Sequence, residues 1–137
     1  MNVLVDTSVW IDFFNGHPSP EAETLVGAID REEDIYTCGV VMAEFLQGIS
    51  APRTMKRLER YFLDMSYVAP REPETYLDSA DLFRALRRRG KTIRSTVDCL
   101  IACLAAEHGL LVLAKDRDMK TILESGLSPA LPYPIAS

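Results

Sequence analysis

Two short apolar runs far apart in the chain constrain the fold most strongly. Residues 2–5 form a β-rich run that ends at Asp6, and residues 110–114 form another that ends just before Lys115 and Asp116. Both have the length and composition of buried strands, and each leads into a segment with a helical pattern. Mostly helical segments lie between them, so the sequence predicts an α/β fold around a central parallel sheet.

The intervening pattern predicts more helices than strands. A helix capped by Thr7 or Ser8 is expected to run to residue 15, and Asp118 is expected to open a last helix that Gly126 stops. Other helices are predicted over residues 20–32, 41–47, 52–63, 73–89 and 96–108, and short strands at 35–38 and 67–68. The segment 128–137 holds three prolines and is predicted to be irregular strand or coil. No repeat or linker interrupts the pattern, so residues 1–137 are expected to form a single domain.

Composition narrows the class of protein. Apolar residues make up 47% of the chain and charged residues 26%, which argues against disorder. No apolar run approaches the roughly 18 to 20 residues of a membrane span, and the N-terminus lacks the features of a signal peptide. No membrane contact is therefore expected. The odd cysteine count, without a framework of spacings, favours reduced thiols in a cytoplasm. The cysteines are Cys38, Cys99 and Cys103.

Basic residues gather locally although the net charge is -5, which by itself disfavours non-specific binding to nucleic acid. Residues 84–94 contain six basic residues and no acidic one: Arg84, Arg87, Arg88, Arg89, Lys91 and Arg94. A second group is diluted by Glu59: Arg53, Lys56, Arg57 and Arg60. A solvated helix face with basic residues near its C-terminus explains either group as readily as RNA binding does.

Four acids are the candidate functional residues. Asp6 and Asp116 follow parallel strands and are therefore expected at the same edge of the sheet, where α/β folds bind ligands. Asp98 falls in the first turn of the apolar helix 96–108, and Glu44 lies within the apolar stretch VVMAEFL, where an unpaired charge would be costly. Each acid alone has an ordinary structural explanation, but a shared cation explains the set.

The donor types indicate which metal and which chemistry. Carboxylate ligands without histidines favour Mg²⁺ or Mn²⁺ over Zn²⁺. A zinc site built from Cys99, Cys103 and His108 is the alternative, although small cysteines on an apolar helix face are common in cores. A metal held by carboxylates activates water and neutralises charge on a phosphate, so the acids predict phosphodiester hydrolysis leaving 5′-phosphate and 3′-hydroxyl ends. Catalysis by His17 and His108 is the less favoured route.

Three motifs carry a resemblance to a known family. In order and spacing, VLVDTSVWIDFF, VVMAEFLQG and STVDCLIACLAAEHGLLVLAKDRDM resemble a PIN-domain ribonuclease, specifically a VapC-type toxin of a toxin–antitoxin pair. The resemblance implies a three-layer α/β/α sandwich around a parallel sheet. It assigns the acidic quartet to Asp6, Glu44, Asp98 and Asp116. It also matches Asp118 to a further acid near the metal, and the hydroxyl of Thr7 or Ser8 to a group that binds water or supports the metal ligands.

The resemblance also implies partners. It predicts a homodimer held inactive by a VapB-type antitoxin, whose C-terminal segment lies across the groove and places a basic side chain near the acids. The implied substrates are structured RNAs, tRNA or ribosomal RNA, so that the free toxin inhibits translation. Because the basic stretch leads into the helix with Asp98, four of its residues are expected to grip phosphates beside the metal. They are Arg87, Arg88, Lys91 and Arg94.

Two other functions remain open from the residues themselves. Asp6 after a strand is also where a phosphatase or phosphoacceptor domain places its nucleophile, although Ser8 departs from the Asp-x-Asp pattern of one such superfamily. A non-catalytic module that binds RNA or protein is the other alternative. Its expected sign, a missing acid, is not found in this sequence.

Overall fold

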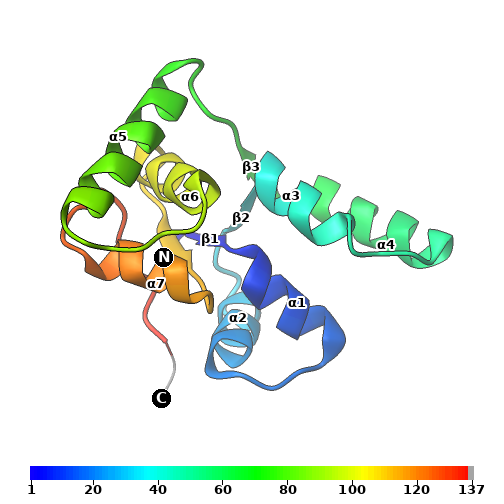
Figure 1. Ribbon diagram of the computed structural model, residues 1–137. Helices are drawn as coiled ribbons and strands as arrows, with labels where there is room; N and C mark the ends of the chain where they lie inside the picture. The colour runs from blue at the N-terminus through cyan, green and yellow to red at the C-terminus, as the bar shows by residue number, and fades with distance from the viewer. Residues whose placement is uncertain (136–137) are drawn as a thin grey trace.

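A parallel sheet of four strands lies at the centre of the molecule, in the order β3-β2-β1-β4 (Figure 1). The structure, a computed structural model, describes residues 1–135. Val3 pairs with both Ile35 and Leu111, so β1 lies between β2 and β4. The strands are β1 (Val3–Val5), β2 (Ile35–Cys38), β3 (Ser66–Val68) and β4 (Leu111–Leu113).

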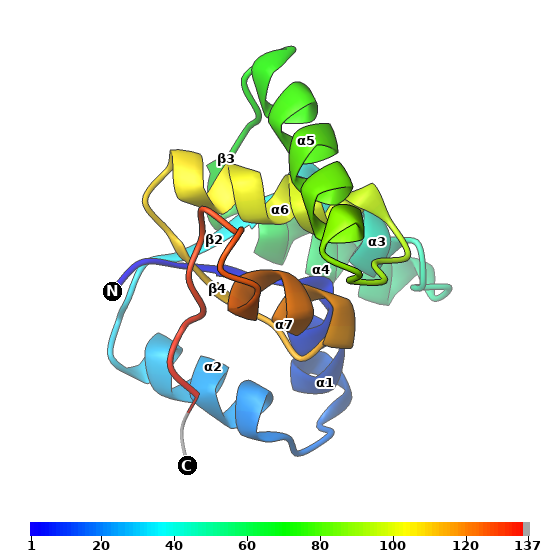
Figure 2. The same cartoon turned by 60° about the vertical axis from the view of Figure 1, so that its left-hand side comes forward.

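Helices cover both faces of this sheet. Figure 2 shows α5 and α6 above the strands and α2 below them, which confirms the expected three-layer α/β/α arrangement. The pair α3 and α4 extends as an arm from the rest of the molecule (Figure 1). The helices are α1 (Thr7–Asn15), α2 (Pro20–Asp30), α3 (Gly39–Leu46), α4 (Pro52–Leu63), α5 (Glu74–Arg88), α6 (Thr96–Glu107) and α7 (Arg117–Glu124).

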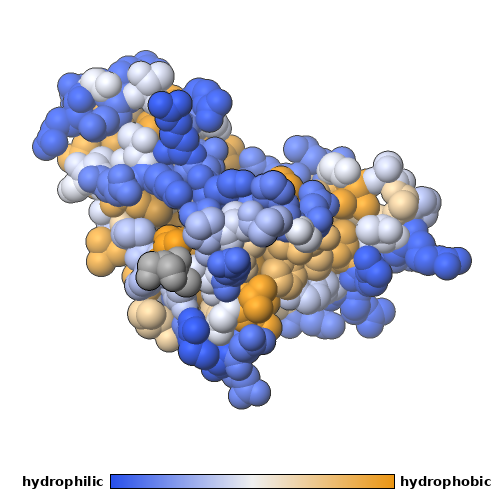
Figure 3. Space-filling model, turned by 90° about the horizontal axis from the view of Figure 1, so that it is seen from below, coloured by the Kyte–Doolittle hydropathy of each residue, from blue (hydrophilic) through white to orange (hydrophobic). Residues whose placement is uncertain are grey.

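The core forms around β1 and α6. All three residues of β1 are fully buried, as expected of a central parallel strand. In α6, Ile101, Ala102 and Ala105 are also fully buried, so the uniformly apolar pattern of this helix reflects packing on several sides. None of the helices among residues 1–135 is long and apolar enough to cross a membrane. The surface seen from below carries many hydrophilic residues, with hydrophobic patches between them (Figure 3).

The cysteines are buried in this core as free thiols. Burial raises the pKa of Cys99 to about 12 and that of Cys103 to about 11, which keeps both protonated and poor as ligands. The His108 ring contacts the Ala69 carbonyl oxygen at 3.3 Å. The three residues of the zinc alternative do not form a group of closely spaced potential ligands among residues 1–135.

Two helices begin with a different cap from the expected one. The N-cap of α1 is Asp6, not Thr7 or Ser8, and the N-cap of α7 is Asp116, not Asp118. Each cap follows a strand closely, and its carboxylate accepts a backbone N–H from the first turn of the next helix, from Ser8 in α1 and from Met119 in α7. Two acids of the expected metal site therefore also start helices.

The C-terminal segment runs beside β4. The Val112 N–H donates to the Leu131 carbonyl, and the Tyr133 N–H donates to the Val112 carbonyl at 2.8 Å. The Tyr133 hydroxyl donates to Glu33, which also pairs with Arg31. The predicted irregular strand or coil is observed through residue 135, as coil with one isolated bridge between Val112 and Pro132, and residues 136–137 lie outside the described residues.

Candidate metal centre

Acidic side chains from four segments meet at the carboxyl edge of the sheet. Asp6 follows β1, and Asp116 and Asp118 follow β4, because the parallel register brings the ends of both strands to one edge. Asp98 comes from α6 and Glu44 from α3. All five line one pocket of about 320 Å³, which their neighbours Thr7, Ser8, Ile11, Arg94, Ser95 and Val97 complete.

Three of the acids form the tightest group. Carboxylate oxygens of Asp98, Asp116 and Asp118 lie within 4.8 Å of one another, close enough for one cation to contact all three. Asp6 lies deeper in the same pocket and is 4% exposed. An all-oxygen donor set of this kind fits a hard divalent cation. The sequence did not decide whether Asp118 is a metal ligand or a helix cap. In the structure its side chain lies inside the cluster.

Glu44 differs from the sequence-based expectation. It was expected to be buried, but its side chain is exposed at the rim of the pocket. The apolar residues of α3 divide between faces, so that Val41 and Phe45 are buried while Glu44 points outward. The Thr7 hydroxyl donates to Glu44 Oε1 at 3.1 Å. The argument from burial was therefore wrong for this residue, although Glu44 does reach the acidic pocket.

Ser8 connects the two strand ends. Its hydroxyl donates to Asp6 Oδ2 at 2.7 Å and accepts the backbone N–H groups of Lys115, at 3.1 Å, and Asp116, at 3.2 Å. One side chain thus orients the acid after β1 and holds the chain after β4. The two hydroxyls have different roles, since Thr7 contacts Glu44 and Ser8 contacts Asp6.

Burial and mutual repulsion raise the pKa values of two acids in the pocket. Burial, followed by the charges of Asp6 and Asp116, raises the pKa of Asp98 to about 7. Burial also raises the pKa of Asp6, against the hydrogen bonds from Ser8 that favour its ionised form. The metal-free pocket therefore retains a proton near neutral pH, which a bound cation would displace.

Arg94 makes a contact that sequence reasoning missed. Its Nε and its backbone N–H both donate to Asp118 Oδ2, at 3.0 and 3.2 Å, and Nη2 lies 4.0 Å from Asp116 Oδ1. Burial acts to raise the pKa of Asp118, but the bonds from Arg94 outweigh it and lower that pKa. Arg94 stands four residues before Asp98, and no sequence signal separated it from the other arginines.

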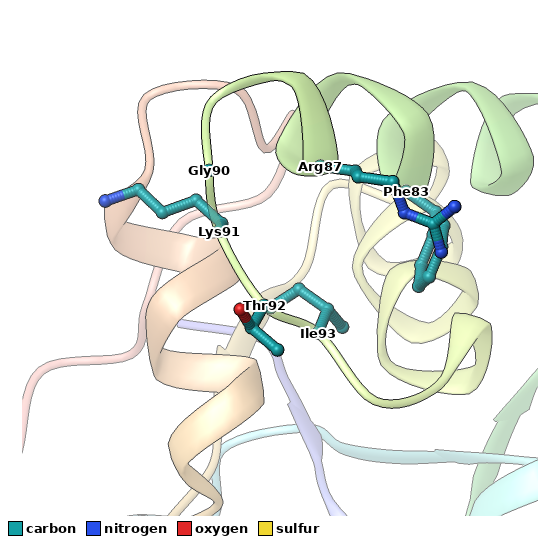
Figure 4. A pocket seen from close by; sticks show the side chains of 6 residues that line it. All are labelled: Phe83, Arg87, Gly90, Lys91, Thr92 and Ile93. Atoms are coloured by element: carbon teal, nitrogen blue, oxygen red, sulfur yellow. The ribbon is translucent and has the colours of Figure 1, made fainter.

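The remaining basic residues expected to bind RNA do not line this pocket. Arg87 and Lys91 line a neighbouring hollow, shown in Figure 4, between the end of α5 and the loop that follows it. Arg88 lines neither of these two hollows. The structure thus separates the expected phosphate-binding group into Arg94 at the acids, Arg87 and Lys91 at the neighbouring hollow, and Arg88 outside both.

Sequence comparison finds relatives over most of the chain. The family model described as the PIN domain matches residues 3–123. Ribonuclease VapC11 of Mycobacterium tuberculosis is 32% identical over 121 residues, covering 88% of this chain and 90% of that protein. VapC ribonuclease Mb1587 of Mycobacterium bovis matches with the same identity and coverage.

Solved structures share the fold. VapBC-1 from nontypeable Haemophilus influenzae superposes with a TM-score of 0.71 at 18% identity, covering 98% of both chains. VapC20 of Mycobacterium tuberculosis, described as a Sarcin-Ricin loop cleaving toxin, superposes with a TM-score of 0.62 at 18% identity, covering 95% of this chain and 99% of that one. At such identities the likeness concerns the fold alone.

Proposed function

Since the chain belongs to the PIN-domain family, with VapC ribonucleases among its relatives, we propose that it is a metal-dependent endoribonuclease and the toxin of a toxin–antitoxin pair. The observation that carries the proposal is the cluster of Asp98, Asp116 and Asp118 beside Asp6 in one pocket. The proposed substrates are structured RNAs, tRNA or ribosomal RNA, in the cytoplasm. Cleavage of such RNAs inhibits translation until an antitoxin binds.

We propose that Asp98, Asp116 and Asp118 hold Mg²⁺ or Mn²⁺, and that Asp6 and Glu44 complete the acidic surround. The bound ion would lower the pKa of an attacking water and neutralise charge that develops on the phosphate. Ser8 keeps Asp6 oriented toward the pocket. The Thr7 hydroxyl donates a hydrogen bond to Glu44 Oε1. The other carboxylate oxygen, Oε2, would then accept a hydrogen bond from water at the rim of the pocket.

Arg94 is positioned to contact the phosphate of the RNA in the same pocket. The ion pair with Asp118 uses its Nε, Nη2 lies 4.0 Å from Asp116 Oδ1, and the side chain is 73% exposed at the pocket. A phosphate entering the pocket would meet these donors beside the carboxylates. Arg94 would then offset part of the repulsion between the acids and RNA.

An adjoining groove supports the proposed antitoxin. Ile11 and Glu44 line both the acidic pocket and a groove of about 310 Å³, whose other walls include Phe14, Phe45 and Leu58. A VapB-type segment with apolar side chains would fill this groove and direct a basic side chain to the acids. Exposed Tyr67, Tyr76 and Leu77 offer apolar area for the proposed homodimer contact.

The test is RNA cleavage by the purified protein with Mg²⁺ or Mn²⁺, with cut sites mapped by their 5′-phosphate ends. We expect cleavage that chelation abolishes and that Asp98→Asn reduces at least a hundredfold with the fold intact. An exposed acid on α7, replaced as Glu124→Gln, is the control for loss of one charge. Cleavage that survives both chelation and Asp98→Asn would remove the metal site from the mechanism. Hydrolysis of a phosphomonoester without RNA cleavage would favour the phosphatase alternative.

A further inference from the structure

The hollow beside the metal centre has features of a binding site of its own. It has a volume of about 210 Å³ and is lined by Phe83 and Arg87 of α5 and by residues 90–93 of the following loop. Figure 4 shows Arg87 extended along Phe83 on one side, with Thr92 and Ile93 on the loop opposite. None of these residues belongs to the acidic pocket.

Arg87 and Phe83 form a preformed stacking layer. The Arg87 guanidinium carbon lies 4.9 Å from the centre of the Phe83 ring, an attractive cation–π contact that holds the planar group in place. Phe83 packs against the hydrophobic core and so provides a fixed base for that contact. Planar guanidinium and aromatic groups are the surfaces on which unpaired nucleobases stack.

The charge around this hollow is available to a ligand. In the basic stretch, Arg84 pairs with Asp81 and Arg94 pairs with Asp118. Within the described part of the chain, the other four basic residues of the stretch have no carboxylate within ion-pair distance: Arg87, Arg88, Arg89 and Lys91. With a net charge of -5 and five acids in the pocket, the protein needs such local cations to attract RNA.

The hollow is also close to the proposed reaction centre. The loop forms a wall between the two, because Ile93 lines the hollow and Arg94 lines the acidic pocket. The three residue steps from Lys91 to Arg94 span at most about 11 Å, so the hollow and the acidic pocket lie next to each other. A strand with its scissile phosphate at the acids can therefore reach the hollow.

We propose that this hollow is a nucleotide subsite, in which an unpaired base of the RNA near the cut site stacks on the Arg87–Phe83 layer while Lys91 contacts a flanking phosphate. The proposal rests on the proposed ribonuclease function and adds where the enzyme holds its substrate. It also requires the RNA to be single-stranded at that position, because a paired base is not free to stack. Arg88, next to Arg87 but outside the hollow, contributes charge alone.

The experiment separates stacking from charge. Two fluorescein-labelled strands of equal charge serve as probes, a 12-nucleotide oligoadenylate and an abasic ribose-phosphate strand of the same length. Affinities are measured by anisotropy with Mg²⁺ present, in an Asp98→Asn background that prevents cutting. We expect the oligoadenylate to bind roughly 5- to 160-fold more tightly than the abasic strand, the contribution of one stacked base. Arg87→Ala should bring this ratio close to one.

Arg88→Ala is the matched control, since it removes the same charge one residue away. It should weaken binding of both strands equally and leave the ratio unchanged. Arg87→Lys keeps the charge but not the planar group, so it should lower the ratio with little change in abasic binding. Thermal unfolding of each variant separates these effects from loss of folding.

The outcomes distinguish this inference from the ribonuclease proposal. If the protein with Asp98 intact does not cleave RNA, the ribonuclease proposal fails. If it does cleave RNA and Arg87→Ala retains the wild-type ratio, the nucleotide subsite is overturned and the ribonuclease stands. If the ratio is retained while Arg87→Ala weakens binding of the antitoxin, the hollow is a protein contact and the subsite is likewise overturned.

Discussion

Among single residues, Ser8 shows how a small side chain positions the larger charged ones. Its hydroxyl contacts Asp6 and the two N–H groups that follow β4, so it determines the spacing of acids from opposite ends of the sequence. The motif Asp6-Thr7-Ser8 predicted a hydroxyl near the metal. Which of the two hydroxyls faces Asp6 depends on the start of α1, and the structure assigns that contact to Ser8.

The first prediction concerns Ser8→Ala. Two backbone N–H groups would lose their acceptor, and Asp6 would lose its shortest hydrogen bond, so the free energy of unfolding should fall by about 1–3 kcal/mol. Urea denaturation at pH 7.5 measures this change. Thr7→Ala, which removes a single contact at the exposed rim, should cost less than half as much. Equal losses from both variants would contradict the role given to Ser8.

Asp98 leads to a prediction about pH. Its folded-state pKa of about 7 lies above the usual value for an unfolded carboxyl, about 3.9, so the metal-free folded state binds the proton more tightly. Stability from this group is therefore present at low pH and is lost as the pH rises from about 4 through 7. Asp98→Asn replaces the titrating carboxyl with a neutral amide. The melting temperature of the variant at pH 8 should therefore be higher than that of the wild type.

Thermal unfolding in chelator at pH 5 and pH 8 measures this difference. Comparing the variant with the wild type at each pH cancels acids with lowered pKa values outside the cluster, such as Glu33, which have the opposite pH dependence. We expect the advantage of Asp98→Asn to be larger at pH 8 than at pH 5. An advantage independent of pH would mean that Asp98 is not the group that titrates.

At the scale of helices and strands, periodicity and turn residues predicted most of the fold. The bounds of β2 and α4 match the prediction, because their patterns end at clear breakers or caps. The caps of α1 and α7 did not follow from the sequence, because several adjacent residues were suitable caps and the strand ends decided among them. Burial of Glu44 was also mispredicted, since an apolar stretch does not reveal which face of its helix meets the core.

The contact of the C-terminal segment with the sheet gives an element-scale prediction. The Tyr133 hydroxyl donates to Glu33 at 2.8 Å and accepts from Arg31 at 3.1 Å, which fastens this segment to the turn before β2. Tyr133→Phe should lower stability by about 1 kcal/mol, or roughly 2–5 °C in melting temperature. Tyr76→Phe, at an exposed tyrosine, is the control and should change little. A Tyr133→Phe variant as stable as this control would show that the contact contributes nothing.

Across the whole molecule, charge is distributed unevenly. Five acids line the pocket at the carboxyl edge of the sheet. Basic residues that have no carboxylate within ion-pair distance among residues 1–135 gather instead at the end of α5 and along α4. The sequence predicted the members of both groups, because residue types and their order are visible in it. It could not predict that Arg94 contacts Asp118 in the acidic pocket, because this contact depends on how the loop before α6 packs against α7.

This concentration of negative charge makes the proposed metal binding a property of the folded chain as a whole. The acids follow β1 and β4 or lie on α3, α6 and α7, so the pocket exists only when these elements are assembled, and a cation that binds it would stabilise the folded state. At a Mn²⁺ concentration about 100 times the dissociation constant, the gain is about 2.7 kcal/mol. The melting temperature should therefore rise by several degrees in millimolar Mn²⁺ at pH 7.5.

Asp116→Asn should remove most of that rise, because it takes a ligand from the cluster. Glu124→Gln, an equal change of charge on the exposed side of α7, should preserve it. General screening of a protein with net charge -5 would act on all variants alike and would also appear with Na⁺ at matched ionic strength. A rise shared by the wild type and Asp116→Asn would therefore place the ion elsewhere on the protein, and a rise confined to variants with the acidic cluster intact would place it at the carboxyl edge of the sheet.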